Sequence, residues 1–543
     1  MATQPAYAQV ACGTTITTNT LVGSLTCTGN KGLVIGANDI TLTCGENTVI
    51  RGNGVGNAII LSGRTGVTVE DCTVNNWGIG IALASSSNNT LIGNSVSAST
   101  ASGFYLTSSS SNTLDGNIAA GSLQDGFDFE SNSNKNTLIG NTAGNNVQSG
   151  FFFSSSSGNT LTGNTAMANS GSINVSDGFY LDSSSSNSLA GNTAKGNGQD
   201  GFYLTSSSSN SLAGNTAKGN GQDGFFLIAG SGNSLSSDIS ARNTGNGFNL
   251  DSSSNGLWGD NATGNGQNGF EFSSSSDGAL EWDAANSNWG DGFLLSSNSN
   301  QNTVMANIAN KNQQNGFEFS SSSNNTIFAN AATSNEHNGF LFHSSPGNSF
   351  DMNNGTSNGD DGFSFILSSN QQFVDFCLAE GNGQNGFYFG LSSNIINVYA
   401  NSATNNTDDG FDFLSSSSNS ISGNNAIGNG LDGFILGLNS NLNQLFYNGA
   451  NGNFYGFVVE SGSTNNVWSN GADGNGSDGF YLGSATSGNA LRGNSATFNG
   501  GFGYRDLSHG AGTAGTANFY ATSGTDPNTA KGNTLGAFNR AGL

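Results

Sequence analysis

Charged residues are scarce in this sequence, and no long apolar run occurs. Asp, Glu, Lys and Arg make up only 9% of the 543 residues, and 36 acidic residues against 12 basic ones give a net charge of -24. An acidic surface repels phosphate backbones and anionic lipids, so we expect no nucleic-acid partner and no binding to anionic membranes. No stretch of about 18 apolar residues is present, so we expect no membrane span.

Residues that bind transition metals or form disulfides are also few. The chain has three His, and its five cysteines are Cys12, Cys27, Cys44, Cys72 and Cys377, without the close pair typical of a zinc site. In a secreted protein a Cys12–Cys27 disulfide would hold the N-terminal segment together, although the first four cysteines allow three pairings. The alternative is that some of them are simply small buried residues, and we expect Cys377 in the core.

Glycine, in contrast, is abundant and marks a repeat. Residues 178–200 read GFYLDSSSSNSLAGNTAKGNGQD, and residues 201–223 repeat them with one substitution. From Gly80 to Gly501 the opening glycine returns in steps of 22 to 24 residues, except for a step of 28 from Gly150 to Gly178. A fixed period of this length is typical of a solenoid, in which each repeat buries its apolar side against its neighbours. The extra residues of the long step, within 168–175, are expected to form a surface loop.

Each repeat has the pattern of three short strands separated by turns. In residues 202–204 the alternation places Phe and Leu inward and Tyr outward, and two further strands begin near Ser211 and Ala217. Such strands can pair only with their equivalents in the next coil, so we predict an all-β fold, a single parallel β-helix of about 20 coils with about 23 residues each. Its core would contain columns of Phe and Leu, and one turn column of hydrogen-bonded asparagines: Asn94, Asn117, Asn141, Asn164, Asn192 and Asn215.

The ends of the chain depart from the repeat. We assign residues 32–503 to the β-helix, 9–31 to an N-terminal cap and 504–543 to a C-terminal cap or tail. Residues 1–8 end in Ala6-Tyr7-Ala8, which is typical of the end of a secretion signal, but the charged and apolar parts of a signal do not precede it. A shortened signal and a coincidence both explain this, and we favour the first.

The strings SSSNNTLIGN, SSSSNTLDGN and SSSSNSLAGN, with GFYL-type strands before them, resemble the repeats of NosD-type right-handed parallel β-helix proteins of the pectin-lyase-like superfamily. The segment from Cys12 to Leu42 is also similar to the start of proteins in that family. The resemblance covers nearly the whole chain and implies a right-handed β-helix. It implies no single function, because the superfamily includes polysaccharide lyases, hydrolases and epimerases as well as tailspikes and adhesins. The copper-related role of some NosD-type proteins would need a His or Met cluster, which this sequence lacks.

Paired carboxylates are what a polysaccharide hydrolase would use, and the candidates are Asp360-Asp361 and Asp408-Asp409. Each pair precedes an opening glycine, at a position that Asp or Asn occupies in most coils, which favours a turn whose glycine adopts a positive φ. The nearest approach to the Asp-Pro-His motif of related epimerases is Asp526-Pro527-Asn528, which lacks the His. We therefore expect no catalytic residue, and a polysaccharide-processing enzyme (lyase, hydrolase or epimerase) is the alternative.

Calcium is the one cofactor that the acidic residues favour. Carboxylates stacked about 4.8 Å apart repel each other by roughly 1 kcal/mol in water, and a bound calcium ion would relieve that repulsion. The open alternative is a solvated acidic edge screened by salt. The candidate calcium ligands are Asp177, Asp200, Asp223, Asp360, Asp361, Asp408 and Asp409.

The outward residue two places after the opening glycine varies in most coils, but in four successive coils it is aromatic: Phe152, Tyr180, Tyr203 and Phe226. One ring per coil gives a spacing of about 4.8 Å, which is close to the length of a sugar residue. We expect these rings to stack on an extended polysaccharide. The alternative is stacking between coils for stability, worth about 0.2 to 1 kcal/mol per pair.

Together these features predict a non-catalytic, secreted or cell-surface protein that is structural, glycan-binding or both, with a polysaccharide or cell-surface glycan as partner. Besides the enzyme, a second alternative is a self-assembling fibre subunit. Gly-, Ser- and Asn-rich repeats with poorly capped ends would associate end to end.

Overall fold

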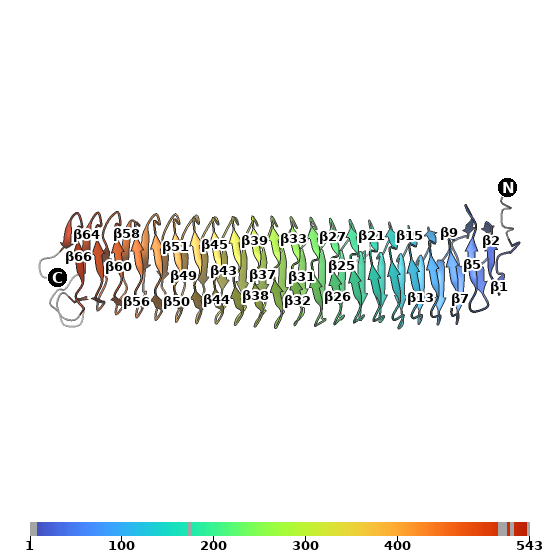
Figure 1. The fold of residues 1–543 in the computed structure, drawn as a ribbon, viewed down its shortest axis with the longest axis horizontal. Coiled ribbons are helices and arrows are strands. Elements are labelled where there is room, and N and C mark those ends of the chain that lie inside the picture. The colour runs from blue at the N-terminus through green and yellow to red at the C-terminus, as the bar shows by residue number, and fades with distance from the viewer. Residues whose placement is uncertain (1–7, 172–175, 509–517, 522–525, 540–543) are drawn as a thin grey trace. The chain divides into compact units, whose positions relative to one another are not determined.

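The protein is described here by a computed structural model that covers residues 8–171, 176–508, 518–521 and 526–539. These residues form short strands and turns and contain no helix, hence none that could cross a membrane. The chain forms two compact units, Met1–Gln267 and Asn268–Leu543. Each unit is a parallel β-helix, as predicted, and the units together hold about 21 coils of about 23 residues (Figure 1). Residues 1–7 of the signal-like segment and 172–175 of the expected loop lie outside the described residues.

Each coil contributes one strand to each of three sheets. In the coil that opens at Gly201 these are β25 (Phe202–Thr205), β26 (Ser211–Ala213) and β27 (Thr216–Lys218). Their inward side chains, two from the first strand and one from each of the others, are buried, which confirms the predicted alternation. Burial of each large apolar side chain stabilises the folded state by about 1.5 to 3 kcal/mol, so every coil adds a similar amount to the stability of the core.

The first sheet of each unit carries the residues discussed below. In the first unit its strands are β1 (Thr15–Ile16), β4 (Lys31–Ile35), β7 (Asn57–Ser62), β10 (Ile79–Ala84), β13 (Phe104–Thr107), β16 (Phe127–Glu130), β19 (Phe151–Ser154), β22 (Phe179–Asp182), β25, β28 (Phe225–Ile228) and β31 (Phe248–Asp251). In the second unit they are β34 (Phe270–Ser273), β37 (Phe293–Ser296), β40 (Phe317–Ser320), β43 (Phe340–His343), β46 (Phe363–Ile366), β49 (Phe387–Gly390), β52 (Phe411–Leu414), β55 (Asp432–Leu436), β58 (Tyr455–Val459), β61 (Phe480–Leu482), β64 (Phe502–Asp506) and β67 (Gly536–Phe538).

The second and third sheets consist mostly of three-residue strands. In the first unit the second sheet runs from β2 (Thr20–Val22) to β32 (Gly256–Trp258), and the third from β3 (Leu25–Thr26) to β33 (Asn261–Thr263). In the second unit the corresponding sheets run from β35 (Ala279–Glu281) to β65 (Phe519–Tyr520) and from β36 (Ala284–Asn286) to β66 (Thr529–Lys531).

Both segments assigned to caps contribute coils. Strands β1, β2 and β3 lie within residues 9–31 and pair in parallel with β4, β5 (Thr41–Cys44) and β6 (Val49–Arg51). In residues 504–543, β65, β66 and β67 pair with β62 (Ala490–Arg492), β63 (Ser495–Thr497) and β64. Strand pairing therefore begins before residue 32 in the first unit and continues beyond residue 503 in the second, where the repeat is no longer visible in the sequence.

Like residues stack from coil to coil in the core. The rings of Phe179, Phe202 and Phe225 are nearly parallel, with centroids 4.8 and 4.7 Å apart. The predicted asparagine column is present, since the side-chain amide of Asn164 donates to Asn192 Oδ1 at 3.0 Å. Asn164 Oδ1 in turn accepts the main-chain N–H of Asn141 at 2.9 Å. Two further asparagine columns, which the sequence analysis missed, make the same contacts in the other turns: one includes Asn89, Asn112, Asn136, Asn159, Asn187 and Asn210, and the other Asn146, Asn169, Asn197, Asn220 and Asn243.

The opening glycine serves a different purpose from the one predicted. Gly201 does not have a positive φ. A Cβ atom there would lie 2.6 Å from the carbonyl oxygen of Gly224 and 2.7 Å from Cβ of Ala217. The position therefore requires glycine because the neighbouring coil is too close for any side chain.

The five cysteines form two disulfides and leave one free thiol. Cys12 and Cys27, the expected pair, form a disulfide. Cys44 and Cys72 form a second one, so these two are not merely small buried residues. Cys377 is a buried free thiol at an asparagine-column position, where its main-chain N–H donates to Asn401 Oδ1 at 2.8 Å.

Candidate functional site

The residues directly before the opening glycines form a column, here called the opening-turn column, along one edge of the first sheet. In the first unit it contains Asp177, Asp200 and Asp223 in successive coils. Asp200 donates its main-chain N–H to Asp177 Oδ1 at 2.9 Å, and Asp223 donates its own to Asp200 Oδ1 at 2.7 Å. These carboxylates join adjacent coils, a structural role that differs from the local turn expected of an Asp-Gly step.

The opening-turn column is not the solvated acidic edge that was one of the two interpretations of these residues. Asp177 and Asp200 are only 1% and 4% exposed, and Asp223 is also buried. Burial disfavours the charged form and raises the pKa of Asp177 to about 7 and that of Asp200 to about 8. The sequence could not show this, because alternation assigns inward and outward positions only within strands.

The four predicted rings form a continuous row on the outward face of β19, β22, β25 and β28. We call Phe152, Tyr180, Tyr203 and Phe226 the aromatic ladder. All four are half-buried, and strand register places them opposite one another. The centroid distances along the ladder are 5.1, 4.8 and 5.3 Å. The last three rings are stacked within 21° and 13°, whereas the first is tilted by 50°, so the ladder has a flat part that begins at Tyr180.

Polar side chains close the aromatic ladder at both ends. Asp128 is the register partner of Phe152 on one side, and Asn249 is that of Phe226 on the other. Asn249 also donates to Asp223 Oδ2 at 2.9 Å, which ties the end of the ladder to the opening-turn column. Burial, and then the charge of Asp182, raise the pKa of Tyr180 to about 12, so its hydroxyl is a neutral donor at physiological pH. The ladder is thus a bounded strip of aromatic surface about 14 Å long, at about 4.8 Å per coil.

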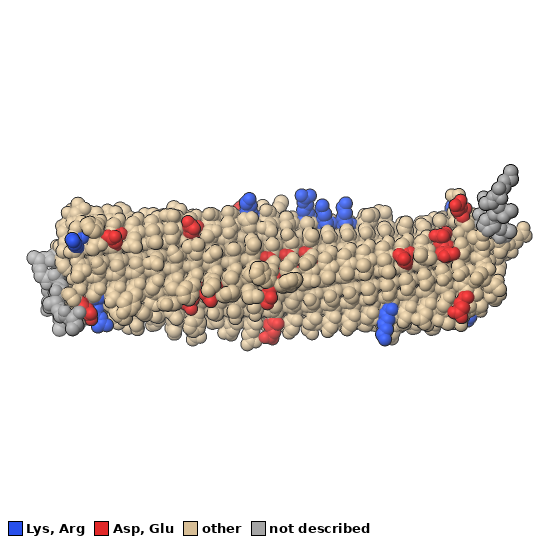
Figure 2. All heavy atoms as spheres, in the orientation of Figure 1, with Lys and Arg blue, Asp and Glu red and all other residues tan. Residues whose placement is uncertain are grey.

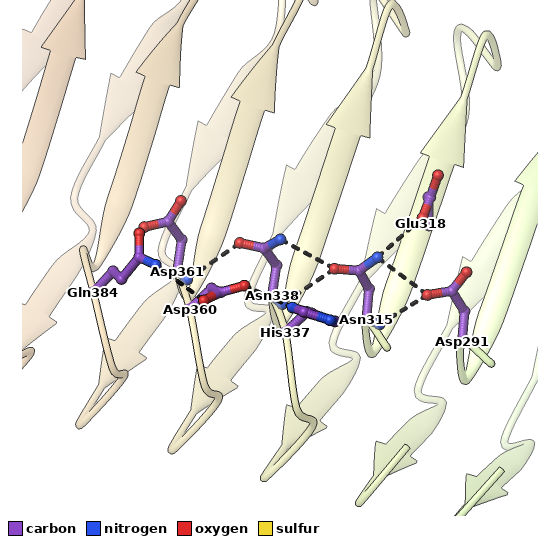
Figure 3. Close-up of polar contacts among 8 residues, drawn as sticks. All are labelled: Asp291, Asn315, Glu318, His337, Asn338, Asp360, Asp361 and Gln384. Carbon is purple, nitrogen blue, oxygen red and sulfur yellow. Dashed lines mark hydrogen bonds and ion pairs between the residues drawn. The ribbon is translucent and has the colours of Figure 1, made fainter. Parts of the chain in front are cut away.

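The two carboxylate pairs of the second unit do not form paired sites. Asp361 and Asp409 are buried in the opening-turn column, whereas Asp360 and Asp408 are half-exposed outside it. Figure 3 shows Asp360 beside His337 and Gln384; His337 Nδ1 lies 2.9 Å from Asp360 Oδ2, and Gln384 donates to Asp360 Oδ1 at 3.0 Å. Within the described residues, no three His, Cys, Asp or Glu side chains converge as a metal site would require.

A carboxylate pair that the sequence analysis missed lies in the same region (Figure 3). The side-chain amide of Asn315 donates to Asp291 Oδ1 at 3.1 Å and to Glu318 Oε2 at 2.9 Å. Glu318 stands on the outward face of β40, with Leu294 and Leu341 as its register partners. Burial raises the pKa of Glu318, and burial together with the charge of Glu318 raises that of Asp291. The sequence does carry a signal for Glu318. It is an acidic residue two places after the opening glycine, a position at which the coils before and after have leucine.

Charged groups are otherwise sparse. Uncharged residues make up most of the face shown in Figure 2, and the few acidic and basic side chains occur singly or in small groups. Clusters of carboxylates are therefore unusual features of this chain, in which only 9% of the residues are charged.

Comparisons with known proteins agree with this architecture. A family model described as "Right handed beta helix region" matches residues 31–179 and 344–496, and one described as "Periplasmic copper-binding protein (NosD)" matches 131–237, 166–256 and 228–375. No curated protein matches the chain.

Several solved structures match parts of the chain. Pectate lyase Pel9A is 15% identical over 44% of this chain and 69% of its own, with a TM-score of 0.34. The A-module of mannuronan C-5 epimerase AlgE4 from Azotobacter vinelandii is 15% identical over 63% of this chain and 86% of its own, with a TM-score of 0.28. The A-module of AlgE6 from the same organism is 12% identical over 62% and 90%, with a TM-score of 0.33. At these identities and TM-scores, nothing about the function of this chain follows from the matches.

Proposed function

Because the chain belongs to the right-handed β-helix family, whose shared scaffold leaves function to the side chains on its coils, we propose that it is an exported glycan-binding protein. The observation that supports this proposal is the aromatic ladder, four half-buried rings in register with one ring per coil. A pyranose ring has an apolar face of C–H groups, and a flat aromatic strip with this spacing suits successive sugars of an extended chain.

Export is supported by the two disulfides at the N-terminal end, since disulfides persist in oxidising compartments. The periplasmic location in the printed description of the NosD model agrees with it. The copper in that description does not suit the residues present. The described part of the chain has no cluster of His, Cys, Asp and Glu that could hold a metal, and burial raises the pKa of the Cys377 thiol to about 12.

Affinity electrophoresis in gels that contain soluble polysaccharides tests glycan binding. The double variant Tyr180→Ser, Tyr203→Ser removes two of the three rings in the flat part of the ladder, and we expect at least one gel that retards the unmodified protein to retard this variant no longer. Tyr388→Ser is the matched control, because Tyr388 occupies the same strand position but has Ser364 and Asp412 as register partners. Equal retardation of the double variant in every gel, or no retardation of the unmodified protein in any gel, would refute the proposal.

A second candidate function, polysaccharide hydrolysis, is favoured by the Asp291–Glu318 pair. The carboxyl of Glu318 is half-buried and its pKa is raised, so it can protonate the glycosidic oxygen as the C–O bond breaks. A water molecule then adds its hydroxyl to the anomeric carbon and gives its other proton to the carboxylate of Asp291. Release of reducing sugars from a polysaccharide panel tests this. Glu318→Gln should abolish release, whereas Glu271→Gln, which changes a glutamate at the same position of β34, should not. Absence of release by the unmodified protein would end this alternative.

A further inference from the structure

An open groove lies on the second unit, at the turn between the first and second sheets. Its volume is about 650 Å³, and its lining includes Asn324, Gln371, Phe373, Ile395 and Asn397. The turn residues that line it come from five successive coils, which corresponds to about 19 Å along the coils at about 4.8 Å per step. This volume is in the range of small-ligand sites, about 300 to 1,000 Å³.

Two residues of this groove depart from the repeat. Phe373 begins β47 (Phe373–Asp375), and its register partners are Ser349 and Asn397. Most other coils have Ser or Thr at this position. Ile395 occupies the turn position that Gln371 and Ser418 hold in the adjacent coils. Phe373 and Ile395 are 54% and 60% exposed, so neither contributes to the core, and two exposed apolar side chains that line one groove point to a ligand.

The rest of the lining is polar and uncharged. The side-chain amides of Asn324, Gln371 and Asn397 make no hydrogen bond to another residue of the described chain. Gly347 lines the groove with a φ of +73°, a backbone conformation that residues with a side chain rarely adopt, and it adds no side chain to the lining. None of the ten lining residues is charged, in a chain with 36 acidic residues.

We propose that this groove binds a short neutral oligosaccharide. Phe373 and Ile395 offer an apolar surface to the C–H face of a sugar ring. The three free amides each offer donors and an acceptor, which matches hydroxyl groups that both donate and accept. A lining without charge provides no partner for a carboxylate or an ammonium group, which selects against charged sugars and peptides. The site is separate from the aromatic ladder and does not depend on the function proposed for it.

Isothermal titration calorimetry of the full chain with cellohexaose, xylohexaose, maltohexaose and laminarihexaose tests this, with hexagalacturonate as the charged comparison. Phe373→Thr and Ile395→Ser introduce residue types that the same columns carry in other coils, so both variants should fold. The matched control is Leu442→Ser. Leu442 has the same turn position, a φ of 58° against 59° for Ile395 and an exposed fraction of 59%, and it lies outside the groove.

We expect at least one neutral hexasaccharide to bind, with a Kd about tenfold weaker or more in Phe373→Thr and Ile395→Ser. Binding should be unchanged in Leu442→Ser and in the aromatic-ladder variant Tyr180→Ser, Tyr203→Ser. The proposal is overturned if no neutral sugar binds at millimolar concentration, if hexagalacturonate binds most tightly, or if Phe373→Thr binds normally. It is also overturned if Phe373→Thr instead abolishes self-association in analytical ultracentrifugation, since the groove would then be a contact with a second copy of the chain.

Discussion

Replacement of Asp177 and Asp200 by Asn should stabilise the protein at alkaline pH and leave its stability nearly unchanged at pH 4. Both carboxyls are buried, and burial raises the pKa of Asp177 from 3.8 to about 7 and that of Asp200 from 3.8 to about 8. The folded state therefore binds these protons more tightly than the unfolded state does. The free energy of unfolding is highest below the ordinary pKa and falls as the pH rises through about 7 to 8.

The size of the effect follows from the two pKa shifts. One pKa unit corresponds to about 1.4 kcal/mol, which sets an upper bound of about 4 to 6 kcal/mol for each carboxylate at pH 9. Relaxation of the turn lets water reach the charge, so we expect each Asn to contribute about 1 to 3 kcal/mol. At an unfolding entropy of about 2.1 cal/mol/K per residue, the double variant should gain about 2 to 5 °C in Tm at pH 9.

Asparagine fits this position without rearrangement. Asn338 holds the same position in the second unit, and its side-chain amide donates to Asn315 Oδ1 at 3.0 Å. Scanning calorimetry at pH 4 and pH 9 is the assay, with Asp251→Asn, a change at a half-exposed site, as control. A Tm difference between the double variant and the unmodified protein that is the same at both pH values would show that ionisation is not the cause, and would refute the reasoning.

Other predictions concern the core and the N-terminal coils. Asn164→Ala should cost about 2 to 4 kcal/mol in urea denaturation, because it leaves the buried N–H of Asn141 unpaired; an unchanged midpoint would contradict this. Cys377→Asn should stabilise the protein by about 1 kcal/mol, because it restores a side-chain donor and acceptor to the asparagine column, and a lower midpoint would contradict it. Reduction of the Cys44–Cys72 disulfide should cost about 2 to 4 kcal/mol and expose the first coils to proteolysis. The double Ser variant of these two cysteines should show the same cleavage with and without reductant.

Two errors show where reasoning from the repeat was insufficient. The opening glycine was expected to supply a positive φ, whereas Gly201 is required because the carbonyl of Gly224 in the next coil lies against it. A solvated acidic edge was one interpretation of Asp200, whereas its side chain is buried and accepts a hydrogen bond from the main-chain N–H of Asp223. Both facts concern contacts between coils, and a single repeat does not show which atoms of the next coil each of its turn residues meets.

The sequence by itself determined the coil: the 23-residue period, the alternation in residues 202–204 and the recurring Asn215-type turn were sufficient for a three-stranded parallel solenoid with Phe and Asn columns. The reason is that each of these features is local and repeated, so one coil predicts its neighbours. Only the tertiary structure decided which turn residues are buried, that Asn315 joins Asp291 to Glu318, and that Phe373 and Ile395 border one groove. Asp291 and Asn315, like Phe373 and Ile395, lie about a full coil apart in the chain, and stacking in register is what brings such residues together.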